Sequence, residues 1–227
     1  MKIRNIWLSG KFPAVSLLIA FLCIAVTVIS VLVPAAGSSF SFTYPVRNPW
    51  QFITYMFEHY TPQEQIPPEL QVASSSLSFG HLVFNLLLVI PFGILIEKVV
   101  GSRKFLVLSA AAWLVDIAVI YTLCAAITPE GGESICKGAS GLAFSFMPVG
   151  VYILYVLGRK YGFGKLLRQV SFWFLMPLAV VTMVIALSPD VAGIANVWSM
   201  LIHLLAVVIG IVFTVVFRKT IAGYFDQ

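Results

Sequence analysis

The feature that most constrains this chain is a series of six long apolar segments. A membrane-spanning helix needs about 20 mostly apolar residues. Segments of this kind cover residues of about 14–33, 79–99, 104–125, 140–157, 171–188 and 197–217. We therefore expect an all-α membrane protein in which six transmembrane helices form one bundle. The expected domain is single and covers residues 1–227.

The composition excludes a soluble domain. Of the 227 residues, 60% are hydrophobic and 10% are charged, and the mean hydropathy is +0.99, whereas a soluble domain is about one quarter charged. The first apolar segment is longer than the core of a signal peptide. No small-residue cleavage site follows it, so we expect it to be retained as a helix.

The basic residues predict how the helices are oriented. The chain has 14 Lys and Arg residues and a formal net charge of +5. If the six helices alternate in direction, only Arg47 and Lys137 fall on one side of the membrane. Because positive charge stays in the cytoplasm, both termini are expected to be cytoplasmic. The basic balance therefore reflects topology and gives no reason to expect a nucleic-acid partner.

A polar stretch of about 34–78 separates the first two apolar segments and contains an aromatic-rich segment at 49–57. This segment is too short to span, and Trp and Tyr favour the headgroup region. It is either an interfacial helix or hairpin or a loop packed on the bundle. Residues 60–79 are predicted to be a mobile polar loop. Tyr60 and Trp198 are expected to be interfacial anchors.

Among the polar residues of the expected spans, four lie near the outer ends of their segments, namely His81, Asn85, Ser140 and His203. Polar side chains are costly in a membrane, and their default interpretation is functional. At a rise of about 1.5 Å per residue, all four fall within about 10 Å of the outer boundary. Asp116 lies near the middle of its span and is expected to be deeper. It is either a third catalytic residue or a structural partner for a polar group on a neighbouring helix.

The spacing of these residues suggests a nucleophile and its base. His81 and Asn85 share a helix face at i, i+4. Gly141 and Ser145 form a small-residue pair at i, i+4 just after Ser140, and Ala206 and Gly210 share a helix face with His203. These small residues would let the two helices approach closely. A serine within hydrogen-bond reach of a histidine is an activated nucleophile. The alternative is that Gly138 to Gly141 form only a small-residue helix contact.

Ser140 is also expected to begin its helix. The first-turn amides of a helix have no intrahelical partner, and the helix dipole is positive there. Such amides can stabilise an oxyanion on a carbonyl that Ser140 attacks. Gly138 and Gly141 would keep side chains out of the path of a substrate, and His81 and Asn85 could add donors.

Taken together, these motifs resemble the rhomboid family of intramembrane serine proteases. The likeness runs in order from about residue 45 to 217 and comprises five pieces. They are Pro49-Trp50 to Glu58-His59, His81-Leu-Val-Phe-Asn85, Phe92 to Gly101-Ser102, Gly138-Ala-Ser-Gly141, and His203 with Ala206 and Gly210. The resemblance implies a six-helix rhomboid-like bundle that cleaves transmembrane segments of membrane proteins near the outer membrane face, without a metal or other cofactor.

The resemblance also implies roles for individual residues. Ser140 would be the nucleophile, and His203 would be the general base and then the general acid. The oxyanion hole would consist of His81, Asn85 and the backbone at Gly138, Ala139 and Ser140. Phe144 matches an aromatic position on which the catalytic imidazole packs. Phe84 matches a residue of the proposed substrate gate.

The chain departs from the family pattern at four places. Gln51 follows Trp50 where Arg is frequent, Ala206 stands where Gly is usual, and Lys137 stands where a small residue is common. About 20 residues separate His59 from the His81 motif, more than is usual. None of these departures removes a catalytic group.

Other functions stay open at this point. A catalytically silent relative would bind transmembrane helices, although the presence of both Ser140 and His203 argues against it. A small transporter or channel is disfavoured because the chain has no internal repeat. The expected partners are transmembrane substrates and the lipid bilayer, the first expectation for the location is a bacterial inner membrane, and the oligomeric state stays open. Cys124 and Cys136 both fall near the outer face and could pair in an oxidising compartment.

Overall fold

The computed structural model describes residues 11–60, 74–187 and 197–226, and most of these are helical. In this part of the chain, five helices are long and apolar enough to cross a membrane. They are α1 (Ala14–Leu32), α4 (Ser74–Val100), α5 (Ser102–Ile127), α6 (Ser140–Tyr161) and α10 (Val197–Tyr224). Helices suit these segments because each satisfies its own backbone hydrogen bonds, which lipid cannot do. The predicted all-α membrane bundle is confirmed.

The remaining helices are shorter. Helix α8 (Val170–Leu187) corresponds to the expected span at 171–188, and its apolar part, Ser171–Val184, is shorter than the five others. The number of six crossings therefore stays a prediction. The other short elements are α2 (Pro34–Phe40), β1 (Phe42–Tyr44), α3 (Gln51–Thr54), η1 (Tyr55–Phe57), β2 (Ser134–Cys136) and α7 (Phe163–Leu166).

One predicted boundary is wrong. Residues 74–79 were expected in a polar loop, but α4 begins at Ser74. The serine run that suggested a loop also suits a helix start, because serine is favoured at helix N-termini. The rest of the predicted loop, at 61–73, lies outside the described residues.

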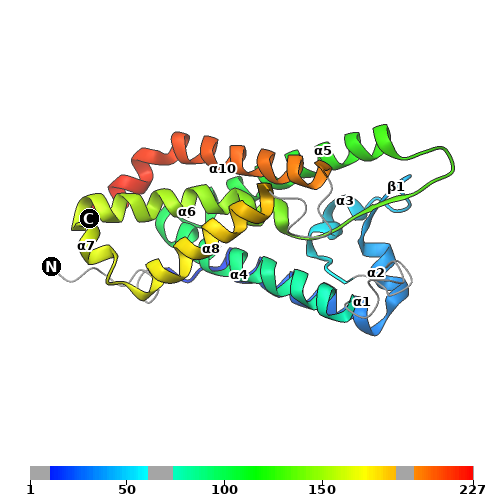
Figure 1. The fold of residues 1–227 in the computed structure, drawn as a ribbon, viewed down its shortest axis with the longest axis horizontal. Helices are drawn as coiled ribbons and strands as arrows, with labels where there is room; N and C mark the ends of the chain where they lie inside the picture. Colours follow the sequence, from blue (N-terminus) through cyan, green and yellow to red (C-terminus); the bar gives the residue numbers. More distant parts are fainter. Residues whose placement is uncertain (1–10, 61–73, 188–196, 227) are drawn as a thin grey trace. The chain divides into compact units, whose positions relative to one another are not determined.

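The chain divides into two compact units, and helices α1, α4, α5 and α6 contribute residues to both. Unit 1 contains residues 1–17, 88–116 and 141–227. In it α10 runs alongside α6 (Figure 1), where a Cβ added at Gly210 would collide with the carbonyl oxygen of Ser145. The rings of Phe105 and Phe146 pack at 4.9 Å.

A buried carboxylate holds the start of α1 in unit 1. Glu97, 3% exposed, accepts hydrogen bonds from the Val15 amide at 3.1 Å and from the Ser16 amide at 2.8 Å. It also accepts from the hydroxyls of Ser16 at 2.6 Å and Ser102 at 2.7 Å. These donors include amides that a helix start leaves without intrahelical partners.

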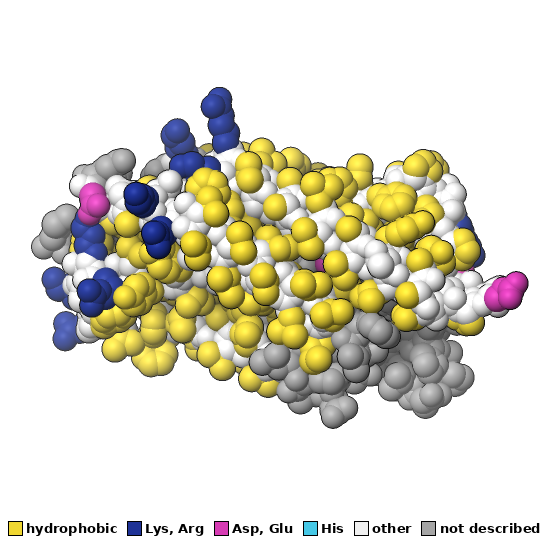
Figure 2. Space-filling model, turned by 90° about the horizontal axis from the view of Figure 1, so that it is seen from above, with side chains coloured by type: hydrophobic (Ala, Val, Ile, Leu, Met, Phe, Trp, Pro, Cys, Tyr) yellow, Lys and Arg dark blue, Asp and Glu magenta, His cyan; other side chains and the backbone are white. Residues whose placement is uncertain are grey.

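Most of the basic residues are concentrated in unit 1. All described Lys and Arg residues except Arg47 and Lys137 belong to this unit. Figure 2 shows most of the Lys and Arg side chains in view gathered at one end, while hydrophobic side chains cover much of the rest of this face. Exposed apolar side chains such as Leu106, Val181 and Val212 suit contact with lipid.

Unit 2 contains residues 18–87 and 117–140. Strands β1 and β2 pair antiparallel in it, with Phe42 opposite Cys136 and Tyr44 opposite Ser134. An aromatic cluster joins this sheet to α3, η1 and α5 through edge-to-face and tilted contacts. Its members are Phe42, Tyr44, Phe52, Tyr55 and Tyr121.

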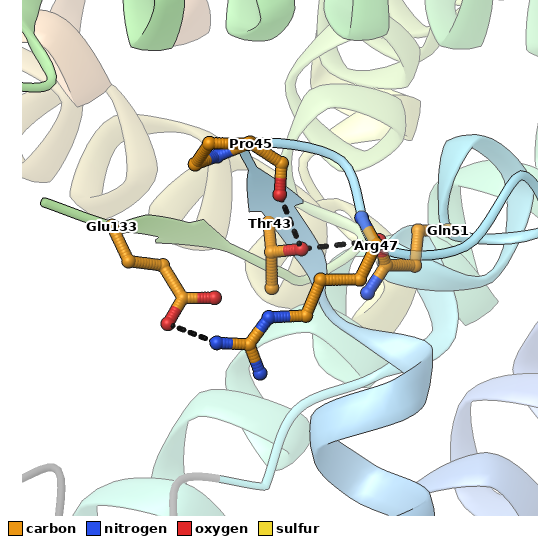
Figure 3. Close-up of polar contacts among 5 residues, drawn as sticks. All are labelled: Thr43, Pro45, Arg47, Gln51 and Glu133. Atoms are coloured by element: carbon orange, nitrogen blue, oxygen red, sulfur yellow. Dashed lines mark hydrogen bonds and ion pairs between the residues drawn. The ribbon is translucent and has the colours of Figure 1, made fainter. Parts of the chain in front are cut away.

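The aromatic-rich segment at 49–57 forms α3 and η1 and packs by one face. Gln51 and Tyr55 are buried, whereas Trp50 and Ile53 are exposed. The Gln51 side-chain oxygen accepts from the Thr43 hydroxyl at 3.1 Å (Figure 3). It also accepts from the Arg47 and Asn48 amides, each at 3.2 Å. Gln51, where the resemblance often has Arg, therefore ties α3 to the loop that leads into it. Arg47 instead pairs with Glu133 at 2.7 Å.

Candidate active site

Ser140 is the first residue of α6 and is half-buried. The three residues that connect it to β2 make a tight turn. Gly138 has φ +110°, a conformation that residues with a Cβ rarely adopt. Its amide donates to the carbonyl oxygen of Tyr55 in η1 at 2.8 Å. Gly138, two residues before the candidate nucleophile, is therefore held by a helical turn that lies more than 80 residues away along the chain.

His59 holds the next amide of this turn. The Ala139 N–H donates to Nε2 of His59 at 3.2 Å. Because Nε2 accepts, a neutral imidazole must carry its proton on Nδ1, which faces the Phe57 carbonyl oxygen at 3.1 Å. Burial, and next the proximity of His81, lowers the pKa of His59 from 6.5 to about 3. A neutral imidazole with one fixed tautomer thus supports the chain immediately before Ser140.

His81 and Asn85 lie on the part of α4 that belongs to unit 2. A Cβ added at Gly138 would come within 2.6 Å of the His81 ring, so this ring packs directly on the turn. The rings of His81 and His59 are 5.0 Å apart. The Asn85 side chain is 1% exposed, and its nitrogen donates to the His81 carbonyl oxygen at 2.9 Å. That nitrogen carries a second N–H. Phe84, on the same helix, is half-buried.

His203 and Phe144 meet in unit 1. The His203 imidazole stacks on the Phe144 ring, with the centroids 4.2 Å apart and the planes at 21°. Ala206 and Gly210, on the same face of α10 as His203, are buried. Phe144 lies one helical turn after Ser140 on α6. The packing of α10 on α6 therefore orients the His203 ring over the first turns of α6.

Asp116 lies closer to the start of α6 than its sequence position suggested. We expected it deeper than Ser140, but a Cβ added at Gly141 would lie 2.6 Å from the Asp116 carboxylate. Asp116 is 8% exposed. The expectation counted residues from one membrane boundary, as if all helices began at the same level. This count overestimated the difference in depth between Asp116 and Ser140. Its carboxylate packs against the residue that follows Ser140, and this contact requires glycine at position 141.

Two charged residues that the sequence did not single out as site residues border His59. Lys137 donates to the Tyr60 carbonyl oxygen at 2.7 Å, and Glu58 accepts from the Tyr60 amide at 2.6 Å and from the Ser30 hydroxyl. Burial lowers the pKa of Lys137 to about 8, and Glu58 opposes this shift. Burial also raises the pKa of Glu58. One feature of the sequence could have pointed to this part of the site. Glu58 and His59, an acid next to a histidine, directly follow the aromatic-rich segment at 49–57.

The apolar helices and the polar residues inside them define an integral, multi-pass membrane protein. A family model, the Rhomboid domain, matches residues 73–220. The chain therefore belongs to the rhomboid family, whose members are generally intramembrane serine proteases. Comparison with curated proteins returns no match.

Proposed function

We propose that this protein is an intramembrane serine endopeptidase that cleaves transmembrane segments of membrane proteins near the outer membrane face. The observation that carries this proposal is the structure at the start of α6. Ser140 begins the helix, and Phe144, one turn later on the same face, supports the imidazole of His203. Family membership supports the same reaction class. Ser140 is the proposed nucleophile and His203 the proposed base.

The reaction follows from these groups. The Ser140 hydroxyl transfers its proton to His203 as the oxygen attacks the carbonyl carbon of the peptide bond. His203 then gives this proton to the leaving amine. Water, deprotonated by His203, hydrolyses the resulting ester and frees Ser140. Because His203 must accept a proton, it acts in its neutral form.

The oxyanion in this proposal is bound by fewer backbone groups than the sequence suggested. The amides of Gly138 and Ala139 already donate to Tyr55 and His59. The proposed donors to the oxyanion are the Ser140 amide, the second N–H of Asn85 and the His81 ring. Removal of one such donor can lower turnover by about 10²–10³.

The proposed enzyme is a single domain of six spans over residues 1–227, with both termini in the cytoplasm. Its substrates are transmembrane segments of other proteins, and its proposed location is a bacterial inner membrane. Phe84 is a proposed contact on the path of substrate entry. The distribution of basic residues supports the orientation.

The proposal is tested with purified protein in detergent, using a fluorophosphonate probe and a model transmembrane substrate. Wild type should be labelled and should cleave. Ser140→Ala and His203→Ala should do neither, because an unassisted hydroxyl is a poor nucleophile. Ser145→Ala is the matched control, since this serine lies on the same helix and its hydroxyl bonds to the Leu142 carbonyl oxygen. Cleavage that persists in Ser140→Ala would contradict the proposal. Substrate binding by wild type without labelling or cleavage would indicate a catalytically silent relative.

A further inference from the structure

Two cysteines of unit 2 lie in contact next to the segment that leads to Ser140. The Sγ atoms of Cys124 on α5 and Cys136 on β2 are 4.0 Å apart. Cys124 is 4% exposed, whereas Cys136 is partly exposed. The third cysteine, Cys23 on α1, is 1% exposed.

The register between α5 and β2 explains why these thiols meet. Thr128 and Ser134 bond through their hydroxyls at 2.7 Å. Thr128 follows Cys124 by four residues, which is one helical turn, and Ser134 precedes Cys136 by two residues, which is one strand repeat. Thr128 therefore lies on the same side of the chain as Cys124, and Ser134 lies on the same face of β2 as Cys136. The turn between α5 and β2 is therefore folded so that the Thr128–Ser134 bond aligns the cysteines.

We propose that Cys124 and Cys136 form a disulfide that ties β2 to α5 four residues before Ser140. The bond would fix the end of the strand from which the Gly138 turn begins. It would also restrict the unfolded chain, because it closes the loop between the two cysteines. This modification does not depend on the proposed proteolytic activity.

Because Cys136 is more exposed than Cys124, the Cys136 thiol reacts first with the oxidant. The oxidant is a small-molecule disulfide such as oxidised glutathione. The Cys136 thiol loses a proton, and its sulfur attacks the oxidant, forming a mixed disulfide and releasing one thiol. The Cys124 sulfur, after losing its proton, attacks Sγ of Cys136 and displaces the second thiol. The protein loses two protons and two electrons, and the oxidant is reduced to two thiols.

The test counts thiols in the full chain purified in detergent. Reduced protein, denatured and treated with a maleimide-linked polyethylene glycol, should acquire three adducts, because the chain has 3 Cys. After oxidised glutathione it should acquire one, and its intact mass should fall by two hydrogen atoms. Cys136→Ser should form no intramolecular disulfide, and Cys23→Ser should lose all maleimide reactivity after oxidation. Three adducts on oxidised wild type, a lasting glutathione adduct or a disulfide-linked dimer would each overturn the proposal.

A second variant tests the alignment without removing a cysteine. Thr128→Val should slow disulfide formation, because the hydroxyl that positions β2 is lost. Thr122→Val is the matched control on α5, the helix that ends just before Thr128, since its hydroxyl bonds only to the Ala118 carbonyl oxygen among the described contacts. Equal oxidation rates in the two variants would show that the Thr128–Ser134 bond does not align the thiols.

Discussion

His59 supports the turn before Ser140 through a hydrogen bond. Two substitutions separate the effect of this bond from the effect of side-chain volume. His59→Leu removes the acceptor for the Ala139 amide, and leaving a buried N–H without an acceptor costs about 1–3 kcal/mol. We expect fluorophosphonate labelling of Ser140 to slow by about tenfold or more on this scale. His59→Gln keeps an acceptor oxygen and should recover part of the rate. If both variants label at the wild-type rate, His59 does not position this turn.

Acidification should destabilise the fold through the same residue. The pKa of His59 is about 3 in the folded protein, below its ordinary value of 6.5. Between these values the unfolded chain binds a proton that the folded chain does not, so the free energy of unfolding falls as pH falls. This contribution is fully present above pH 6.5. The midpoint of thermal unfolding should fall more steeply with acid in wild type than in His59→Gln, and equal slopes would contradict the assignment.

Gly138 meets two separate requirements, a positive φ and the absence of a Cβ. Gly138→Ala should nearly abolish labelling of Ser140, because its Cβ would come within 2.6 Å of the His81 ring. Gly131→Ala is the matched control, since Gly131 also has a positive φ, of 74°, but no atom lies within 4 Å of an added Cβ. The control carries backbone strain of about 1–2 kcal/mol and should keep most of the labelling. Similar losses in both variants would mean that strain alone matters.

At the scale of elements, the contact between α6 and α10 orients His203. Gly210→Ala would drive a Cβ into the Ser145 carbonyl oxygen and separate the two helices. Overpacking of this kind costs about 1–3 kcal/mol, so we expect a lower midpoint of thermal unfolding and slower labelling of Ser140. Gly223→Ala, on the same helix with nothing within 4 Å of its Cβ, should behave as wild type. An unchanged Gly210→Ala variant would rule out a close-packing requirement at this position.

The elements also show what could be predicted from sequence. The five long apolar helices were predictable, because the length of an apolar segment fixes whether it can span lipid. The motif around Ser140 was visible because its glycines stand next to a polar residue in an apolar run. The bond from Ala139 to His59 was not, since the two residues lie 80 positions apart and no local pattern pairs them. The contact of Asp116 with Gly141 was missed for a related reason, because residue counting gives no helix tilt.

For the whole molecule, the orientation in the membrane is the main prediction. In a background with Cys23, Cys124 and Cys136 replaced by Ser, we expect an impermeant maleimide to label Glu130→Cys from outside intact cells and to leave Arg168→Cys unlabelled. The reason is that basic residues gather on the cytoplasmic side, and Arg168 follows Arg159 and Lys160 in the last turn of α6 and Lys165 in α7. Labelling of Arg168→Cys once the membrane is permeabilised is the control. Labelling of Arg168→Cys in intact cells, with Glu130→Cys protected, would invert the topology.

Helix α6 combines two properties that bear on how the protein is made. Among the five long helices of the described chain, it is the least apolar, and the largest share of its residues is buried. Insertion of a helix from the translocation machinery into lipid depends on its apolar character. Of these five helices, α6 should therefore be the slowest to move from the machinery into lipid without a partner helix. Its small and polar residues suit protein neighbours better than acyl chains. The helix that begins with Ser140 would therefore settle in the bilayer only as its partners assemble around it, and the surroundings of Ser140 would be completed late in biogenesis.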